Sequence, residues 1–466
     1  MFFDLSEADE PGVIRWDGGG DGTTWEDPLN WNKGIVPGPG DHVIIDMPGL
    51  ITVTHSLSET VIKSLYSAES FRFSGGSFVI TSSLVISENL IVASDLIISN
   101  SLTISRALIV ENGKLDLRLG RGLTVPTLTL SGGELSNNQT LTVTGGLTWS
   151  GGLLSGSGQT IVQGSTTLTG ATYLKSISAQ RLSLGNTVWE ASANTGNGPY
   201  LYGGNGAVIT LRTGAIFDLQ GDYSFYHDGI GAVPVFNNQG TFTKSAGDVN
   251  TPSYVYFLFN NTGTLNANAG KLQLAGGGVS SGTFKTVAGA TLDFAGGEQH
   301  LKSGTTVSGA GTTAFSGGTT IISGTVSGGV LVSGGTARFA TTNTFSTLEV
   351  SNGELSNNQT LTVTGGLTWS GGLLSGSGQT IIQGTTNLAG NSYLKSISGQ
   401  RLSLGNTIWE ASANTGNGPY LYGGSGAVIT LRTGATFDMQ GDYTLYHDGI
   451  GAVSVWSSTH LHQVGW

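Results

Sequence analysis

The chain has 466 residues, of which 76 are glycine, while charged residues make up only 11% and hydrophobic residues 38%. The net charge is −11 and Lys and Arg form no cluster, which argues against nucleic-acid binding because that function needs a basic surface. The absence of cysteine excludes disulfides and thiolate metal sites, and no apolar run approaches the ~18 residues of a membrane-spanning helix. Short bursts of Leu, Val and Ile between Gly, Ser, Thr and Asn predict many short strands and tight turns, and their regularity argues against disorder.

Residues 1–60 are expected to form an N-terminal cap. Within them, residues 14–48 hold three of the nine Trp and four of the ten Pro. A stack of parallel coils needs such a cover because an open strand edge invites aggregation. The start of the chain lacks the basic and apolar regions of a signal peptide, so we expect either an export signal upstream of this sequence or a protein that stays inside the cell.

Four acidic residues lie among the glycines of this region, and they allow two interpretations. Their oxygens could bind Ca²⁺, or they could cap turns through their side chains. Their spacing matches neither an EF-hand nor the nonapeptide calcium repeat, which favours turn formation. These residues are Asp17, Asp21, Glu26 and Asp27.

Residues 61–130 contain a period of six, which predicts a β-solenoid. Between residues 78 and 110 an apolar residue recurs every six positions, and a second apolar residue follows two positions after each. Residues two apart lie on the same side of a strand, whereas a helix would need spacings of three and four. Three such sides would close a coil of about 18 residues. The first of the two series is Phe78, Leu84, Leu90, Leu96, Leu102 and Leu108.

Residues 131–350 form a first repeat unit, and residues 351–466 a truncated second unit. Residues 131–235 recur at 351–455 with an offset of 220, and only 15 of the 105 aligned positions differ. Such a duplication indicates an array that lengthens without changing its chemistry. From residue 236 the period grows to about 20, as in FNNQGTF and FNNTGTL, which begin 23 residues apart at Phe236 and Phe259. We expect their Gly residues at tight corners and their Asn pairs in stacked amide ladders.

The segment 189–235 departs from this rhythm and holds the densest polar cluster. Its carboxylates could bind Ca²⁺ or perform acid–base chemistry on a polysaccharide, or they could cap turns, and we favour turns. Trp149 and Trp189, with copies Trp369 and Trp409, could likewise stack on sugars or fill the core, and we favour the core. The cluster consists of Arg212, Asp218, Asp222, His227 and Asp228, with copies at Arg432, Asp438, Asp442, His447 and Asp448.

The last residues, 456–466, do not continue the second copy. With synonymous codons, His460–Trp466 shifted by one nucleotide reads Thr-Phe-Thr-Lys-Ser-Ala-Gly, which is the sequence of Thr241–Gly247 at the expected offset. We therefore expect the tail to be a frameshifted end of a longer array. His460 and His462 accordingly receive no functional weight, although they are spaced like metal ligands.

The phrases WDGGGDGTTWEDPLNW and PGPGDHVIID, with FNNxGT and SGGxLSGSGxT downstream, carry a resemblance. They resemble repeat units of bacterial surface and secreted β-strand-repeat proteins, of the autotransporter-like and filamentous-haemagglutinin-like kinds. The resemblance covers most of the chain and implies a right-handed parallel β-helix, export, and a role in adhesion or surface structure. It brings no catalytic residues.

Taken together, these features predict an all-β chain wound as a parallel β-helix, an elongated rod of ~20-residue coils. We expect a non-enzymatic adhesin stalk or structural scaffold outside the cell or on its surface, with glycans or a host or matrix surface as partners. We expect no cofactor, with Ca²⁺ as the alternative. The alternative is a polysaccharide lyase or hydrolase, or a carbohydrate-binding module, on the same fold. An enzyme would need its acidic and basic side chains to converge in one open groove.

Overall fold

The computed structural model describes residues 11–57, 59–170, 174–191, 200–390, 394–410 and 420–458. The fold is an all-β parallel solenoid of about 19 turns with about 20 residues per coil, which confirms the predicted fold class. Within these residues there is no α-helix, and one short 3₁₀ turn, η1, spans Pro28–Asn30. The chain divides into two compact units, residues 1–217 with 226–235 and residues 218–225 with 236–466.

The hexapeptide series occupies three sides of the coil in the first unit, as the period of six predicts. Leu84, Leu90, Leu96, Leu102 and Leu108 are all buried, at 0–4% exposure. Leu90 pairs with Leu108, and Leu84 pairs with Leu102. Leucines of successive coils are therefore aligned in the same ladder. The alternation of inward and outward side chains along each strand gives these aliphatic residues one shared interior.

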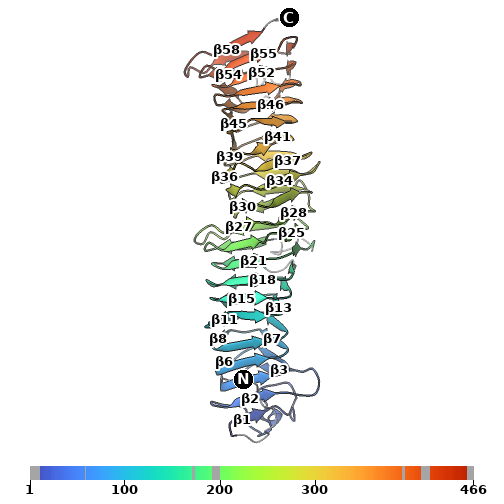
Figure 1. The fold of residues 1–466 in the computed structure, drawn as a ribbon, viewed down its shortest axis with the longest axis vertical. Helices are drawn as coiled ribbons and strands as arrows, with labels where there is room; N and C mark the ends of the chain where they lie inside the picture. The colour runs from blue at the N-terminus through green and yellow to red at the C-terminus, as the bar shows by residue number, and fades with distance from the viewer. Residues whose placement is uncertain are drawn as a thin grey trace. The chain divides into compact units, whose positions relative to one another are not determined.

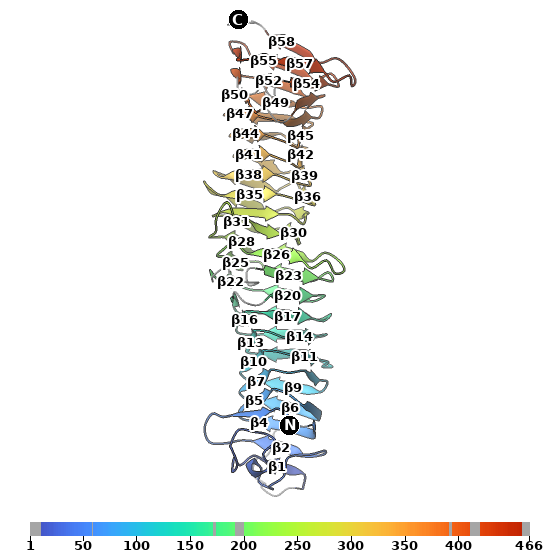
Figure 2. The ribbon, with the colours of Figure 1, turned by 180° about the vertical axis from the view of Figure 1, so that it is seen from behind.

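The strands of the first unit pair in parallel in four ladders (Figures 1 and 2). The ladder that starts nearest the N-terminus contains β1 (Val13–Arg15), β2 (His42–Ile45), β4 (Glu59–Ser67), β6 (Ser77–Ile86) and β9 (Ser101–Ile104). The second contains β3 (Thr52–His55), β5 (Ser70–Phe73), β7 (Asn89–Val92), β10 (Ala107–Val110), β13 (Thr127–Leu130), β16 (Leu147–Trp149), β19 (Thr166–Leu168) and β22 (Thr187–Trp189). The third contains β8 (Leu96–Ile98), β11 (Lys114–Leu117), β14 (Glu134–Asn137), β17 (Gly152–Ser155), β20 (Lys175–Ser178) and β23 (Tyr200–Gly204). The fourth contains β12 (Leu123–Val125), β15 (Thr140–Val143), β18 (Gln159–Val162), β21 (Arg181–Leu184) and β24 (Val208–Leu211).

The second unit repeats this construction. Strands β25 (Ile216–Leu219), β26 (Ser224–His227) and β27 (Val235–Asn238) contain residues of both units, and β30 spans Leu258–Asn261. One ladder contains β28 (Thr241–Lys244), β31 (Thr264–Ala267), β34 (Thr283–Thr286), β37 (Thr306–Gly309) and β40 (Thr325–Val326). The next contains β29 (Ser253–Val255), β32 (Lys271–Leu274), β35 (Thr291–Phe294), β38 (Thr312–Phe315), β41 (Gly329–Val332), β44 (Thr347–Val350), β47 (Leu367–Trp369), β50 (Thr386–Leu388), β53 (Thr407–Trp409) and β56 (Phe437–Met439).

Two further ladders complete the second unit. The first contains β33 (Gly278–Ser280), β36 (Glu298–Leu301), β39 (Thr319–Ile322), β42 (Thr336–Phe339), β45 (Glu354–Asn357), β48 (Gly372–Ser375), β51 (Lys395–Ser398), β54 (Tyr420–Gly424) and β57 (Thr444–His447). The other contains β43 (Asn343–Phe345), β46 (Thr360–Val363), β49 (Gln379–Ile382), β52 (Arg401–Leu404), β55 (Val428–Leu431) and β58 (Val455–Ser458).

The tryptophan-rich N-terminal segment lies against the first coils. Trp16, Trp25 and Trp31 are buried, and the ring centroid of Trp31 lies 4.8 Å from that of Trp16 and 4.7 Å from that of Trp25. Trp25 in turn contacts the rings of Phe71 and Phe78, at 5.8 and 5.2 Å. This aromatic cluster joins the irregular segment to the interior of the solenoid.

The corners of the longer coils contain the expected asparagine ladders. Asn238 Nδ2 donates to Asn261 Oδ1 at 2.8 Å, and Asn260 Nδ2 donates to Asn237 Oδ1 at 3.0 Å. The glycine at the following corner allows two coils to approach closely. A Cβ on Gly263 would lie 2.0 Å from the carbonyl oxygen of Gly240 in the preceding coil. Gly263 does not need a left-handed backbone, so here the spacing between coils, rather than φ, requires glycine.

No helix among the described residues has both the length and the apolar composition needed to cross a membrane.

Candidate ligand-binding surfaces

The polar residues singled out at 212–228 are engaged mainly in local structure. Asp222 forms an ion pair with the buried Lys244, with 2.8 Å between Oδ1 and Nζ, and its Oδ2 accepts from the backbone N–H of Asp248. Burial lowers the pKa of Lys244 below its ordinary value, while the hydrogen bond and charge of Asp222 act in the opposite direction. Asp222 is therefore the counter-ion of an interior lysine that the sequence alone did not single out.

Arg212 connects coils of the first unit. Its Nη2 donates to the carbonyl of Val162 at 2.7 Å, and its Nη1 donates to the carbonyl and hydroxyl oxygens of Ser183, both at 3.2 Å. These partners lie 50 and 29 residues away in sequence, two coils and one coil before Arg212. The guanidinium thus satisfies backbone carbonyls at a corner.

The remaining members of the first-copy cluster contact residues close to them in the sequence. Asp228 Oδ1 accepts from the N–H of Ile230 at 2.8 Å, and its carboxylate occupies the space that a side chain at Gly204 would fill. His227 lies beside it, with 4.0 Å between Nε2 and Asp228 Oδ1. Asp218 accepts from the side chain of Gln220 at 2.8 Å. The bond from Ile230 supports the turn-capping interpretation for Asp228, whereas Asp218 lies within β25 and bonds a neighbouring side chain.

The second copy shows whether the polar residues of the cluster meet in one groove, because all five of them belong to one unit. Arg432 follows β55, Asp438 lies within β56 and His447 ends β57, and these strands belong to three different ladders. Arg432 donates to the carbonyl of Ile382, and Asp438 accepts from Gln440. The ladders form different sides of the coil, so the sequence cluster is distributed around it.

Only the histidine and the aspartate after it lie together in the second copy. The distance from His447 Nδ1 to Asp448 Oδ1 is 3.9 Å, and Nδ1 also lies 3.2 Å from the carbonyl oxygen of Gly423. Asp448 accepts from the N–H of Ile450 at 2.8 Å, as Asp228 does in the first copy. Asp442, the counterpart of Asp222, is exposed, and no lysine follows Lys395 in the sequence.

The acidic residues of the N-terminal segment hold its loop together. Asp21 Oδ1 accepts from the N–H groups of Thr23 and Thr24, each at 2.8 Å, and from Asn30 Nδ2 at 2.9 Å. These bonds hold the pKa of Asp21 well below its usual range, with the side chain of Thr24 as the largest cause. Asp27 caps η1 by accepting from the N–H of Leu29.

Glu26 accepts from the N–H groups of Ser56 and Leu57, and Asp17 accepts from the N–H of Gly19. The part of the chain that the structure describes contains no group of three His, Asp or Glu side chains placed to hold a metal ion. The hydrogen bonds agree with the structural role predicted for these acidic residues. His460 and His462 lie outside the described residues.

The four tryptophans considered for sugar stacking belong to the core. Trp149, Trp189, Trp369 and Trp409 are each 0% exposed. Their positions at the ends of β16, β22, β47 and β53 point inward, so they cannot meet a sugar on the surface.

Three tyrosines on β23 and β26 form an outward aromatic cluster instead, and they were not among the residues predicted from the sequence. Tyr200 and Tyr202 alternate with the buried Leu201 on β23, and Tyr226 follows the buried Phe225 on β26. The ring of Tyr226 stacks on that of Tyr202, with centroids 5.6 Å and planes 26° apart, and lies 5.3 Å from Tyr200. The alternation in YLYGG was the signal that could have revealed this cluster.

The second copy reproduces the tyrosine cluster in its own unit. Tyr422 and Tyr446 stack with centroids 5.3 Å and planes 20° apart, and Tyr420 lies 5.4 Å from Tyr446. Tyr446 is 45% exposed. Each copy therefore presents the same arrangement of three phenol rings.

A buried lysine lies behind each tyrosine cluster. Lys175 on β20 and Lys395 on β51 are 0% exposed, and burial lowers the pKa of each to about 8. Lys175 Nζ donates to the carbonyl of Gly170 at 3.3 Å and lies 5.7 Å from the centroid of the Trp189 ring. These lysines point into the interior, away from the outward tyrosines.

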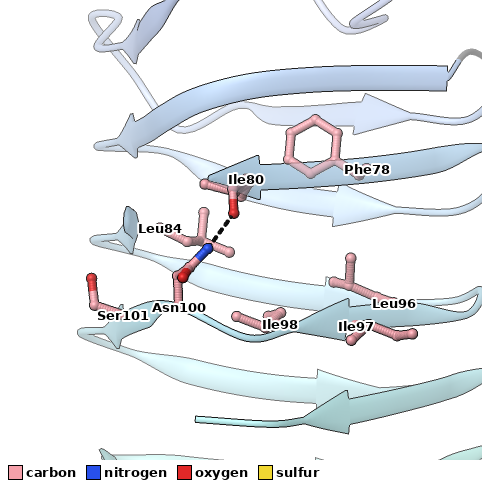
Figure 3. A pocket seen from close by; sticks show the side chains of 8 residues that line it. All are labelled: Phe78, Ile80, Leu84, Leu96, Ile97, Ile98, Asn100 and Ser101. Carbon is pink, nitrogen blue, oxygen red and sulfur yellow. Dashed lines mark hydrogen bonds between the residues drawn. The ribbon is translucent and has the colours of Figure 1, made fainter. Parts of the chain in front are cut away.

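A small cleft opens between β6 and β8 in the first unit. The second half of β6, Ser83–Ile86, pairs with β9. Strand β8 pairs with β11, and among the described strands it has no ladder pairing with the first half of β6. Figure 3 shows apolar side chains lining this gap and a hydrogen bond from Asn100 Nδ2 to the carbonyl of Ile80, at 2.7 Å. Val79 and Ile97 are 46% and 53% exposed beside it. The cleft is a local interruption of strand pairing with an apolar lining.

A scan against protein-family models, a search of curated proteins and a search of solved structures each found no match to this chain.

Proposed function

We propose that this protein is a non-enzymatic β-solenoid that acts outside the cell or on its surface as an adhesin stalk or structural scaffold. The observation that carries the proposal is the distribution of the second-copy polar residues over three ladders. A hydrolase or lyase needs an acid and a base on one substrate. Arg432, Asp438 and His447 lie on different sides of the coil instead.

The backbone supplies what a scaffold requires. Each inner strand bonds to the coils before and after it, so the N–H and C=O groups along the axis are used within the solenoid. Columns of buried leucine, valine and phenylalanine give a continuous interior in each unit. Duplicating a segment of such a structure adds length while each coil keeps the same neighbours.

The proposal is tested by locating the protein and by assaying turnover. Antibodies against the chain should label intact cells of the source organism, and protease added outside should remove the label. Incubation of the chain with neutral and acidic polysaccharides should release neither reducing ends nor unsaturated products. An exclusively internal location would contradict the surface role. Product release that disappears in His447→Ala would favour the polysaccharide-active alternative.

A further inference from the structure

A serine occupies the position beneath each tyrosine stack. On the outward face of the third ladder of the first unit, Glu134 pairs with Leu153, Leu153 with Ser176, and Ser176 with Tyr202. Strands in a ladder are about 4.8 Å apart, so Leu153 and Tyr202 are separated by about 9.6 Å. Serine is smaller than either neighbour, so the register places a small side chain between an aliphatic and an aromatic one, and we call the space over Ser176 the slot.

The aromatic wall of this slot is one face of the Tyr202 ring. The other face is covered by Tyr226, which stacks on it. Because neighbouring rings in a ladder stack along the coil axis, the face of Tyr202 opposite Tyr226 is turned towards Ser176, and none of the ring contacts among the described residues lies on that face. Stacking by Tyr226 and edge contact from Tyr200 hold the ring in place, so the wall is ordered before any ligand binds.

The rim of the slot is polar, and its charge is compensated. Asn205 Nδ2 donates to Ser178 Oγ at 2.9 Å, and Ser155 Oγ donates to Glu134 Oε1 at 2.6 Å. Glu134 also forms an ion pair with Lys114, at 2.9 Å. Hydroxyl and amide groups that both donate and accept therefore border an apolar slot.

The second unit contains the same Leu–Ser–Tyr register, although Ser425 stands where the first copy has Asn205, and Gly334 stands 220 residues after Lys114. Leu373 pairs with Ser396, and Ser396 pairs with Tyr422, whose other face is covered by Tyr446. Ser375 Oγ donates to Glu354 Oε1 at 2.5 Å on the rim. The strand register that creates the slot is thus reproduced wherever this segment winds.

We propose that the slot at Ser176 and Tyr202, and its copy at Ser396 and Tyr422, each bind one pyranose ring of a neutral polysaccharide. A pyranose ring combines an apolar face of C–H groups with a rim of hydroxyls, which matches the aromatic wall and the polar border. The inference rests on the proposed adhesive function and gives that function a ligand class. A single slot has few contacts, so its dissociation constant is expected on the order of 1 mM.

The test measures binding of the full chain to immobilised dextran, cellulose oligosaccharides and β-1,3-glucan, with hyaluronan as the acidic comparison. The double variant Ser176→Leu and Ser396→Leu fills both slots at outward positions and should weaken binding at least tenfold. Thr142→Leu and Thr362→Leu make a matched change at outward positions on β15 and β46 and should leave binding unchanged. Tyr202→Phe with Tyr422→Phe keeps both ring faces and should also bind.

Far-UV circular dichroism and the urea midpoint establish that each variant is folded, and Tyr202→Ala with Tyr422→Ala replaces the leucine variant if that one does not fold. Binding to none of the neutral glycans, binding to hyaluronan alone, or binding that survives in the slot-filled variant would overturn the inference. Surface labelling of cells is independent of these results. The scaffold role can therefore stand when the glycan slot fails, and the reverse also holds.

Discussion

At the scale of single residues, the role of a polar side chain depends on the residue one coil away. Asp222 and Asp442 occupy equivalent positions in nearly identical segments, yet Asp222 forms an ion pair with the buried Lys244 whereas Asp442 is exposed. The lysine lies 22 residues after Asp222, and the sequence has no lysine after Lys395. Sequence identity between the copies therefore does not ensure identical energetics.

This difference gives a paired mutational prediction. Asp222→Asn leaves the Lys244 ammonium buried beside a neutral amide and should lower the free energy of unfolding by about 3 kcal/mol. Asp442→Asn should change it by less than about 0.5 kcal/mol because that carboxylate is on the surface. Urea denaturation of both variants measures the difference. Equal effects from the two substitutions would contradict the proposed role of the ion pair.

The interior lysines give a pH dependence whose sign follows from their lowered pKa. Lys175 and Lys395 titrate near 8 in the folded chain and near 10.5 when unfolded, so the unfolded chain binds more protons between these values. Stability should therefore rise with pH from about 8 to about 10.5, by up to about 1.4 kcal/mol per pH unit for each lysine. Below pH 8 the two lysines are protonated in both the folded and the unfolded chain, so they add no pH dependence to the free energy of unfolding.

The lysine contribution is isolated by comparing the chain with the variant Lys175→Met and Lys395→Met. Urea midpoints measured from pH 7 to pH 10.5 should rise less steeply in the variant. All other ionisable groups are present in both proteins, so their contributions cancel in the comparison. Parallel curves for the two proteins would show that the lysines do not titrate as inferred.

At the scale of strands and corners, the positions of the buried leucines and of the asparagine ladders were largely predictable from short sequence patterns. The six-residue spacing of Leu84, Leu90 and Leu96 indicated three inward-facing sides, and these leucines are buried. The repeated FNN phrases indicated corner ladders, and their amides bond from coil to coil. Both patterns are local because side-chain alternation and tight turns are decided within a few residues.

The corner glycines give a prediction at this scale. In Gly263→Ala the new methyl group would meet a carbonyl oxygen of the preceding coil and should cost about 1–3 kcal/mol of stability. Gly120 also lies outside the left-handed region, and a Cβ there meets nothing within 4 Å, so Gly120→Ala should be neutral or slightly stabilising. Thermal denaturation compares them. A neutral Gly263→Ala would show that the coils are not closely spaced at this corner.

At the scale of the whole molecule, each segment carries its own strand register. Glu134 pairs with Leu153 in the first copy, and Glu354 pairs with Leu373 in the second. The same sequence has thus formed the same local ladder in two different units. This is the expected behaviour of a repeat structure, in which each coil contacts only its neighbours.

A deletion of one repeat length should therefore be tolerated. Removing residues 135–354 joins Glu134 to Leu355, leaves 246 of the 466 residues (466 − 220), and restores a sequence that exists in the native chain. We expect a β-type circular dichroism spectrum and a cooperative urea transition. Removing residues 135–344 shifts the join by ten residues, places strands opposite corners, and should yield an unfolded or aggregated product. Similar behaviour of the two deletions would contradict the requirement for register.

The sequence by itself determined the winding: an all-β chain of short parallel strands, with leucine columns inside and a duplicated segment. These properties follow from alternation and spacing along a few neighbouring residues. Only the tertiary structure decided that Asp222 neutralises Lys244 and that Ser176 lies between Leu153 and Tyr202. Those outcomes depend on which residue lies one coil above or below, and that neighbour is 22–26 residues distant in these cases, at a spacing that varies from coil to coil.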